Sequence, residues 1–255
     1  MPVTTELTQM PRKDLHIFYI LDTSGSMKGA KISALNHAMD ETIEALRTIS
    51  KQNGDARLKI AVLNFNTGAE WVTKNGPEYL EEHFEYEYLE AGGMTDMGAA
   101  LRELNSKLSQ REFLGSMMGA LMPVMIFMTD GYATDDYEEA LGEIRKNRWF
   151  ARGTKIGFAL GEDADVKMIS SVVGNSEAVI RVTDNELFRR LMRFVSVTTS
   201  MARSQSATAE TAPTGAEILR LTDGLPEAAK VRLDKDDYNP ENAVAEDDDW
   251  GDDKW

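Results

Sequence analysis

Residues 22–26 read Asp-Thr-Ser-Gly-Ser and directly follow an apolar run over residues 15–21. Asp22, Ser24 and Ser26 alternate along what we expect to be one tight turn, so a carboxylate and two hydroxyl oxygens can converge. Ligands of this kind suit a small hard cation such as Mg2+, which takes six oxygens in near-octahedral geometry. The turn therefore predicts part of a metal site.

Two later segments can complete this shell. Thr95, in the sequence Gly-Gly-Met-Thr-Asp of residues 92–96, would add a third hydroxyl. Asp130, in the sequence Thr-Asp-Gly of residues 129–131, would add a second carboxylate. At most two negative charges then oppose the two positive charges of the ion, and a coordination position is left over. A carboxylate from another molecule is the natural sixth ligand, because it brings both a charge and an oxygen.

Strand-like and helix-like segments alternate between residue 15 and about residue 200, as judged from apolar runs and from apolar residues spaced by three or four. This alternation predicts a doubly wound, Rossmann-like α/β fold, with a mostly parallel central sheet, one short antiparallel edge strand and helices on both faces. Ligands of such sheets bind beyond the carboxyl ends of the strands, where the Asp22 and Asp130 turns fall. We expect strands over 15–21, 58–65, 123–128, 155–160 and 178–182, an edge strand over 69–73, and helices over 28–50, 97–108, 135–146, 163–173 and 185–200.

Charge and composition exclude several classes of function. The net charge of −15 over 255 residues argues against a nucleic-acid partner, since binding phosphates needs a cationic surface. There is no cysteine, which rules out disulfides and thiolate metal sites. No secretory leader is visible at the N-terminus, and the longest apolar run, residues 117–128, is about half of what spans a bilayer. We therefore expect a cytoplasmic protein with no membrane partner.

The excess of negative charge is concentrated at the C-terminus. Residues 204–255 hold 14 acidic and 5 basic side chains, a net charge of −9. We predict a domain over residues 1–203 and a flexible acidic tail over residues 204–255. The tail ends in an acidic run with Trp250 and Trp255. It has three open interpretations: a solvated disordered segment, a docking motif for a basic surface, or a carboxylate that blocks the metal site of its own or a neighbouring molecule.

Patterns typical of enzymes fit this chain poorly. Phosphatases of the haloacid dehalogenase type also place an Asp after a strand, but they need a second Asp two residues later, where this chain has Ser24. Motifs for nucleophilic hydrolysis and for nucleotide binding are absent from the sequence. His16, His37 and His83 fall in an expected strand, helix and loop, which gives no zinc or catalytic cluster. We expect a binding protein rather than an enzyme.

The three motifs, in this order, resemble the metal-ion-dependent adhesion site (MIDAS) of the von Willebrand factor A (VWA) domain, over about residues 15–203. The Asp-Thr-Ser-Gly-Ser turn matches the D-x-S-x-S of the family, residues 129–131 match its T-D-G, and Thr95 resembles its threonine. The resemblance implies a VWA fold and a partner protein that supplies a carboxylate to the metal. It also implies Mg2+ or Mn2+, with Ca2+ less favoured, bound by Asp22, Ser24, Ser26, Thr95 and Asp130.

Within this family the chain is similar to the bacterial TerY-type proteins. The similarity rests on the helix expected just after Met27, on Thr134-Asp135-Asp136 after the T-D-G, and on residues 160–165. TerY-type proteins accompany tellurite-resistance and stress clusters, often beside a protein kinase and a phosphatase. The resemblance thus implies an adaptor or scaffold with such partners. A subunit that delivers substrates to an ATPase or chelatase complex is the alternative.

Several neighbouring residues have expected roles around the site. Met27, Met94, Met97 and Tyr132 would form a rim that contacts the partner, since methionine adapts to varied surfaces. For Asp96 we favour capping of the helix at residue 97 or exposure to solvent, and contact with a metal ligand is the alternative. Asp163 and Asp165 are expected to begin a helix, with a second metal site as the alternative.

Overall fold

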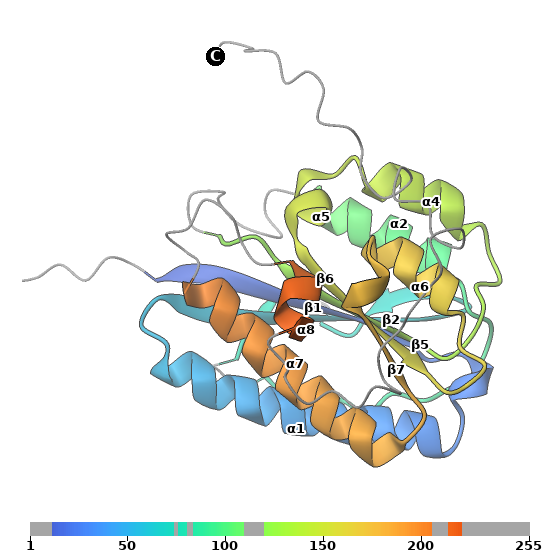
Figure 1. The fold of residues 1–255 in the computed structure, drawn as a ribbon, viewed down its shortest axis with the longest axis horizontal. Helices are drawn as coiled ribbons and strands as arrows, with labels where there is room; N and C mark the ends of the chain where they lie inside the picture. The colour runs from blue at the N-terminus through green and yellow to red at the C-terminus, as the bar shows by residue number, and fades with distance from the viewer. Residues whose placement is uncertain (1–11, 74–75, 81–83, 110–119, 206–213, 221–255) are drawn as a thin grey trace, which may run out of the picture.

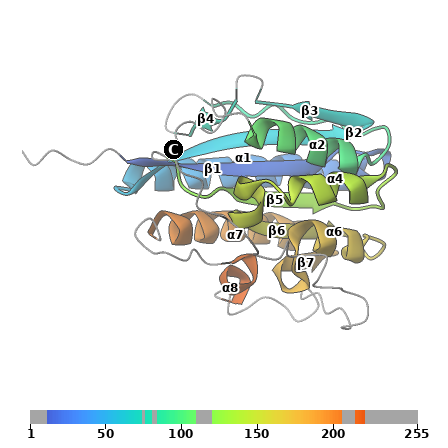
Figure 2. The same cartoon turned by 90° about the horizontal axis from the view of Figure 1, so that it is seen from above.

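A mostly parallel β-sheet forms the centre of the molecule in the computed structural model, which describes residues 12–73, 76–80, 84–109, 120–205 and 214–220. The strand order is β3-β2-β1-β5-β6-β7, with β4 also paired to β2 (Figure 2). β3 and β4 run antiparallel to β2, and the other strands are parallel. The bounds are β1 Lys13–Asp22, β2 Ala56–Asn66, β3 Gly68–Trp71, β4 Glu78–Tyr79, β5 Val124–Thr129, β6 Thr154–Leu160 and β7 Val179–Val182.

Helices cover both faces of the sheet (Figure 1). One face packs against α1 (Ala30–Gln52) and α7 (Asn185–Gln205). The other packs against α2 (Met97–Leu108), α4 (Tyr137–Ile144), α5 (Arg148–Arg152) and α6 (Val166–Val173). Alternate side chains of β1 enter the two cores, which explains why this strand is a continuous apolar run rather than an alternating one.

The strand order reverses between β1 and β5, because the chain passes from β1 to β2 on one side and later adds β5 on the other. β1 and β5 are direct neighbours, with Leu21 opposite Met128 in the parallel register. The residues that follow these two strands therefore meet at the carboxyl edge of the sheet, where doubly wound folds bind ligands. A short 3-10 helix, η1 (Gly25–Met27), carries the chain from β1 into α1.

The predicted fold class is confirmed, with differences in detail. β4 and α5 were not predicted, because segments of two and five residues are too short to show a periodicity. The helix predicted from residue 135 begins at Tyr137, because Asp136 caps it by accepting a hydrogen bond from the Glu139 N–H at 3.3 Å. None of the helices among the described residues is long and apolar enough to cross a membrane.

Part of the predicted tail lies within the described residues. Helix α8 (Gly215–Arg220) packs against α7, β6 and the 3-10 helix η2 (Ser176–Ala178), and Ala216 is buried there. The domain boundary at residues 203 and 204 stays a prediction. Trp250, Trp255 and the acidic run around them lie outside the described residues.

Candidate metal centre

Asp22 lies at the carboxyl end of β1 and is fully buried. Its Oδ1 accepts a hydrogen bond from the Ser24 N–H at 2.7 Å, and its Oδ2 accepts one from the Thr129 hydroxyl at 2.6 Å. The next residue, Thr23, donates its N–H to the Phe65 carbonyl at 2.8 Å. The Asp22 carboxylate is thus held by contacts to its own turn and to the end of β5.

A chain of hydroxyls connects this turn to Asp130. The Ser24 and Ser26 Oγ atoms lie 3.0 Å apart, and the Ser26 hydroxyl donates to Asp130 Oδ1 at 2.6 Å. Asp130 Oδ2 accepts a hydrogen bond from the Lys31 ammonium, so the two side chains form an ion pair. Asp22, Ser24 and Asp130 are buried, whereas Ser26 is exposed and lies at the mouth of the site.

Thr95 faces the same place from a third loop. A Cβ added to Gly131 would lie 3.7 Å from the Ser26 Oγ and 3.8 Å from the Thr95 Oγ1, so both hydroxyls border the space that this glycine leaves open. Thr95 is fixed by two hydrogen bonds to Thr134: its N–H donates to the Thr134 Oγ1, and its carbonyl accepts from the Thr134 N–H, each at 2.9 Å. The structure therefore brings Thr95 beside the serine turn.

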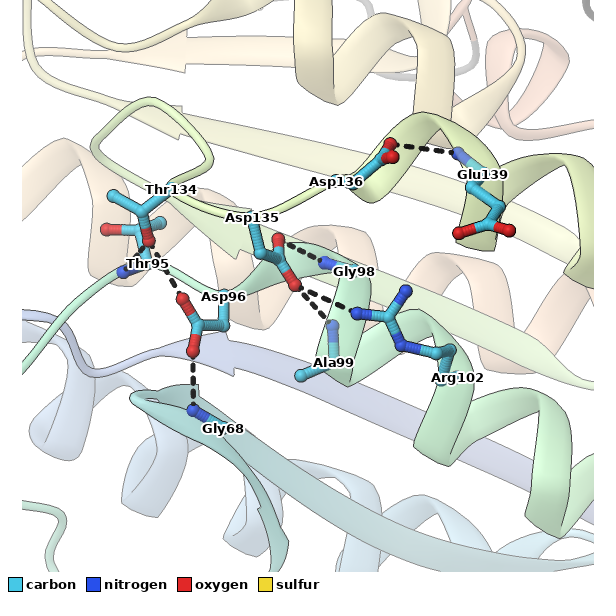
Figure 3. Close-up of polar contacts among 10 residues, drawn as sticks. All are labelled: Gly68, Thr95, Asp96, Gly98, Ala99, Arg102, Thr134, Asp135, Asp136 and Glu139. Carbon is cyan, nitrogen blue, oxygen red and sulfur yellow. Dashed lines mark hydrogen bonds and ion pairs between the residues drawn. The ribbon is translucent and has the colours of Figure 1, made fainter.

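Asp96 ties the loops around the site together (Figure 3). Its two carboxylate oxygens accept hydrogen bonds from the Thr134 hydroxyl and from the Gly68 N–H, each at 2.9 Å. Asp96 stands at the N-cap position of α2, as expected, but its side chain makes no capping hydrogen bond, because both of its oxygens accept from other loops. It joins the Thr95 loop to the β5–α4 loop and to the β2–β3 turn.

The N-terminus of α2 is capped by a residue from another loop, Asp135 (Figure 3). The Asp135 carboxylate accepts hydrogen bonds from the Gly98 and Ala99 N–H groups, each at 2.8 Å, and pairs with Arg102. A negative charge is favourable at this end of a helix. A Cβ on Gly98 would come within 2.7 Å of Asp135 Oδ2, so only glycine allows this close approach. The hydrogen bonds from Gly98 and Ala99 to Asp135 fix the loop that carries Asp130 against the start of α2, which follows Thr95.

The electrostatics of the site fit a bound cation. Burial raises the pKa of the Asp22 carboxyl, hydrogen bonds from Thr129 and Ser24 lower it, and the nearby Asp130 charge raises it. A buried carboxylate loses hydration, and a cation beside it would offset that cost. Among the described residues no three His, Cys, Asp or Glu side chains cluster as a metal site. The donors are two carboxylates and three hydroxyls, a set of hard oxygens suited to Mg2+ or Mn2+.

Two of the four residues predicted to form the rim are exposed, and their contact with a partner stays a prediction. Met94 and Tyr132 are exposed, at 52% and 66%, on the loops that carry Thr95 and Asp130. Met27 and Met97, also expected on the rim, are fully buried in the two cores and can contact no partner. Met27 packs in the core on the α1 side of the sheet and holds η1 there, and Met97 packs in the core on the α2 side and holds the start of α2.

The structure thus brings Asp22, Ser24, Ser26 and Asp130 into one hydrogen-bonded group and places Thr95 beside it, while their role as metal ligands stays a prediction. Sequence reasoning did not identify Lys31, which is separated from Asp130 by 99 positions. Asp163 is exposed and Asp165 caps α6 through the Met168 N–H at 3.0 Å, as expected for residues that begin a helix.

Residues 17–133 match the family model described as von Willebrand factor type A domain, and this segment contains all five candidate ligands. The match covers less than half of the chain, and together with the strand order it identifies the fold as that of a VWA domain. No curated protein matches the chain.

Several solved structures share the fold. A von Willebrand factor type A protein from Catenulispora acidiphila is similar at 21% identity and a TM-score of 0.55, over 74% of this chain and 43% of that one. Proximal thread matrix protein 1 from the mussel byssus, in a structure described as having a zinc-occupied MIDAS motif, is similar at 16% identity and a TM-score of 0.56, over 73% and 48%. The pilus adhesin SpaC from Lactobacillus rhamnosus GG is similar at 11% identity and a TM-score of 0.56, over 74% of this chain and 31% of that one. The chain spans less than half of the length of each.

Proposed function

We propose that this protein is a metal-dependent interaction module that binds an acidic residue of a partner protein through a divalent cation. The ion would be Mg2+ or Mn2+, held by Asp22, Ser24, Ser26, Thr95 and Asp130. The observation that carries the proposal is the hydrogen-bonded chain from Asp22 through Ser24 and Ser26 to Asp130 at the carboxyl edge of the sheet. When bound, the ion would supply a positive charge and a coordination position for the carboxylate of the partner.

The residues around the site support binding rather than catalysis. The position two residues after Asp22, where a phosphatase of the haloacid dehalogenase type needs a general acid, is Ser24, whose hydroxyl contacts Ser26. The Thr129 hydroxyl donates a hydrogen bond to Asp22, and the Thr134 hydroxyl donates one to Asp96. These contacts preorganise the oxygens and lower the entropy lost on binding.

The surface beside the site supports a partner that is both acidic and apolar. Met94 and Tyr132 lie next to ligand loops, and both loops are fixed: the Met94 N–H donates to the Thr67 Oγ1 at 3.1 Å, and the loop of Tyr132 is joined to Thr95. Tyrosine and methionine are enriched at protein interfaces. We infer that the acidic residue of the partner is flanked by an apolar side chain that packs against this pair.

The contribution of this rim is tested with Tyr132→Ser in the full-length protein. We expect the affinity for the partner to fall about tenfold or more, because an exposed aromatic beside a charged anchor often dominates binding energy. The affinity for Mg2+ alone should stay as in the wild type. An unchanged affinity for the partner in a binding titration would remove Tyr132 from the interface.

The proposal as a whole is tested by capture. Immobilised protein is exposed to lysate of the native source with MgCl2 and again with EDTA, alongside Asp22→Asn. We expect one set of partners to be retained only by the wild type in MgCl2. Partners retained equally in EDTA, or by the variant, would contradict a metal-bridged interaction.

The setting we propose is a bacterial stress or tellurite-resistance-like system in the cytoplasm, with a kinase or phosphatase as the partner. The support is the similarity of Thr134-Asp135-Asp136 and residues 160–165 to TerY-type proteins. In the structure, Thr134 and Asp135 are the residues that fix the Thr95 loop and α2. Recovery of an ATPase in the same capture would favour the substrate-delivery alternative instead.

A further inference from the structure

Lys31 places a positive charge inside the candidate metal centre. It lies in the first turn of α1, and its ammonium pairs with Asp130 Oδ2. The Asp130 side chain is fully buried, whereas the Lys31 side chain is 36% exposed. The other oxygen, Asp130 Oδ1, accepts the Ser26 hydroxyl at 2.6 Å. Both oxygens of one expected ligand are therefore occupied by groups of the protein itself.

The ammonium lies at the junction of two strand ends. Asp130 follows β5, and a Cβ on Gly161, which follows β6, would lie 3.7 Å from the Lys31 Nζ. Gly161 has a φ of +101°, a conformation that favours glycine. A residue with a side chain, which could contact the Lys31 ammonium in place of Asp130, is therefore disfavoured at this position. The Lys31 side chain thus extends from α1 past Gly161 to Asp130.

This charge changes the electrostatics of the site. Asp22 and Asp130 together place two negative charges around a divalent cation. The Lys31 ammonium reduces the net charge of the site to −1. Like charges repel strongly in a partly buried site, where water screens them less than at the surface. A dication entering beside Asp130 must either tolerate the ammonium or displace it from Asp130 Oδ2.

We propose that Lys31 is an internal cation that competes with the divalent metal for Asp130 and so keeps the affinity of the site for metal low. The proposal rests on the proposed metal site. It gives a role to an ion pair that the ligand set does not explain. A site of reduced negative charge holds metal weakly by itself, so the carboxylate of a partner adds the charge that it lacks. Metal and partner then bind cooperatively, because each increases the affinity for the other.

The test is a calorimetric titration of the full-length protein with MgCl2 at constant ionic strength. Lys31→Gln removes the charge but keeps a hydrogen-bonding side chain. We expect its dissociation constant for Mg2+ to be lower than that of the wild type by about tenfold or more. Lys31→Arg keeps the charge and should resemble the wild type. Lys28→Gln, at an exposed lysine just before α1, makes the same change in net charge and should also resemble the wild type.

Each outcome separates the two proposals. Mg2+ binding that is equal or weaker in Lys31→Gln, or equally tightened in Lys28→Gln or Lys31→Arg, would overturn the role of Lys31 and leave the metal site intact. If Mg2+ bound neither the wild type nor Lys31→Gln, the metal site itself would be wrong.

A second measurement needs no variant. Acetylation of lysine amines in the wild type is followed by mass spectrometry in EDTA and in MgCl2, with Lys28 as the internal reference. We expect Lys31 to react faster in MgCl2, because the metal releases its ammonium from Asp130. A Lys31 rate that does not rise relative to Lys28 would contradict the competition.

Discussion

Asp22→Asn is expected to abolish stabilisation by Mg2+ and capture of the partner while leaving the fold intact. The amide keeps the size of the side chain, and its NH2 can donate to the Thr129 hydroxyl where Asp22 Oδ2 now accepts. Because burial already disfavours the charged carboxyl of Asp22, we expect the free energy of unfolding without metal to change by about 1 kcal/mol or less. The loss is therefore specific to the metal.

The measurement is thermal unfolding in EDTA and in MgCl2. At about 100 times the dissociation constant, Mg2+ should stabilise the wild type by about 2.7 kcal/mol. The variant should gain nothing, since a lost ligand charge weakens binding by more than about 100-fold. Asp136→Asn is the matched control: it removes the same charge nearby, at a helix cap where Asn serves as well as Asp. Equal Mg2+ stabilisation of Asp22→Asn and the wild type would remove Asp22 from the site.

The sequence was sufficient to predict where the candidate site lies. β1 and β5 are buried on both faces, so each appears in the sequence as an apolar run. The first run leads directly into the Asp22 turn, and the second leads into the Thr-Asp-Gly motif that contains Asp130. In a doubly wound sheet the ends of such strands meet, which brings Asp22 and Asp130 together without any knowledge of contacts. The helix over residues 97–108 was also predictable, because its apolar residues recur with helical spacing.

The contacts that fix the site were not predictable in the same way. Asp135 looked like an N-terminal residue of its own helix, yet it caps α2, from which it is separated by 36 or 37 positions. Lys31 looked like an ordinary charged residue of an amphipathic helix. Periodicity describes which face of an element is buried, but it does not say which side chain of a distant loop will meet it. Met27 and Met97 show the same limit: Met27 ends η1, Met97 begins α2, and both side chains are buried in the core.

His16 should make the stability of the protein depend on pH. It is buried on the α2 face of β1, stacked on Phe18, and its two ring nitrogens have no hydrogen-bond partner among the described residues. Its pKa is lowered from 6.5 to about 4: burial lowers it most, the nearby Lys59 charge also lowers it, and the Asp14 charge raises it. Between these pH values the unfolded chain binds a proton that the folded protein does not. The free energy of unfolding is therefore unaffected by His16 protonation above pH 6.5, and it decreases as the pH falls from 6.5 towards 4.

The expected loss is about 3 kcal/mol, since each unit of pKa difference is worth about 1.4 kcal/mol. Denaturant unfolding of the wild type and His16→Leu from pH 7.5 to pH 4 measures it as the difference between the two proteins, which cancels the titration of carboxylates. We expect the variant to become progressively more stable than the wild type as the pH falls. His37→Gln, at an exposed histidine of α1, is the control and should follow the wild type. A difference between His16→Leu and the wild type that does not change with pH would show that His16 is protonated in the folded protein as readily as in the unfolded chain, against what its burial in the sheet demands.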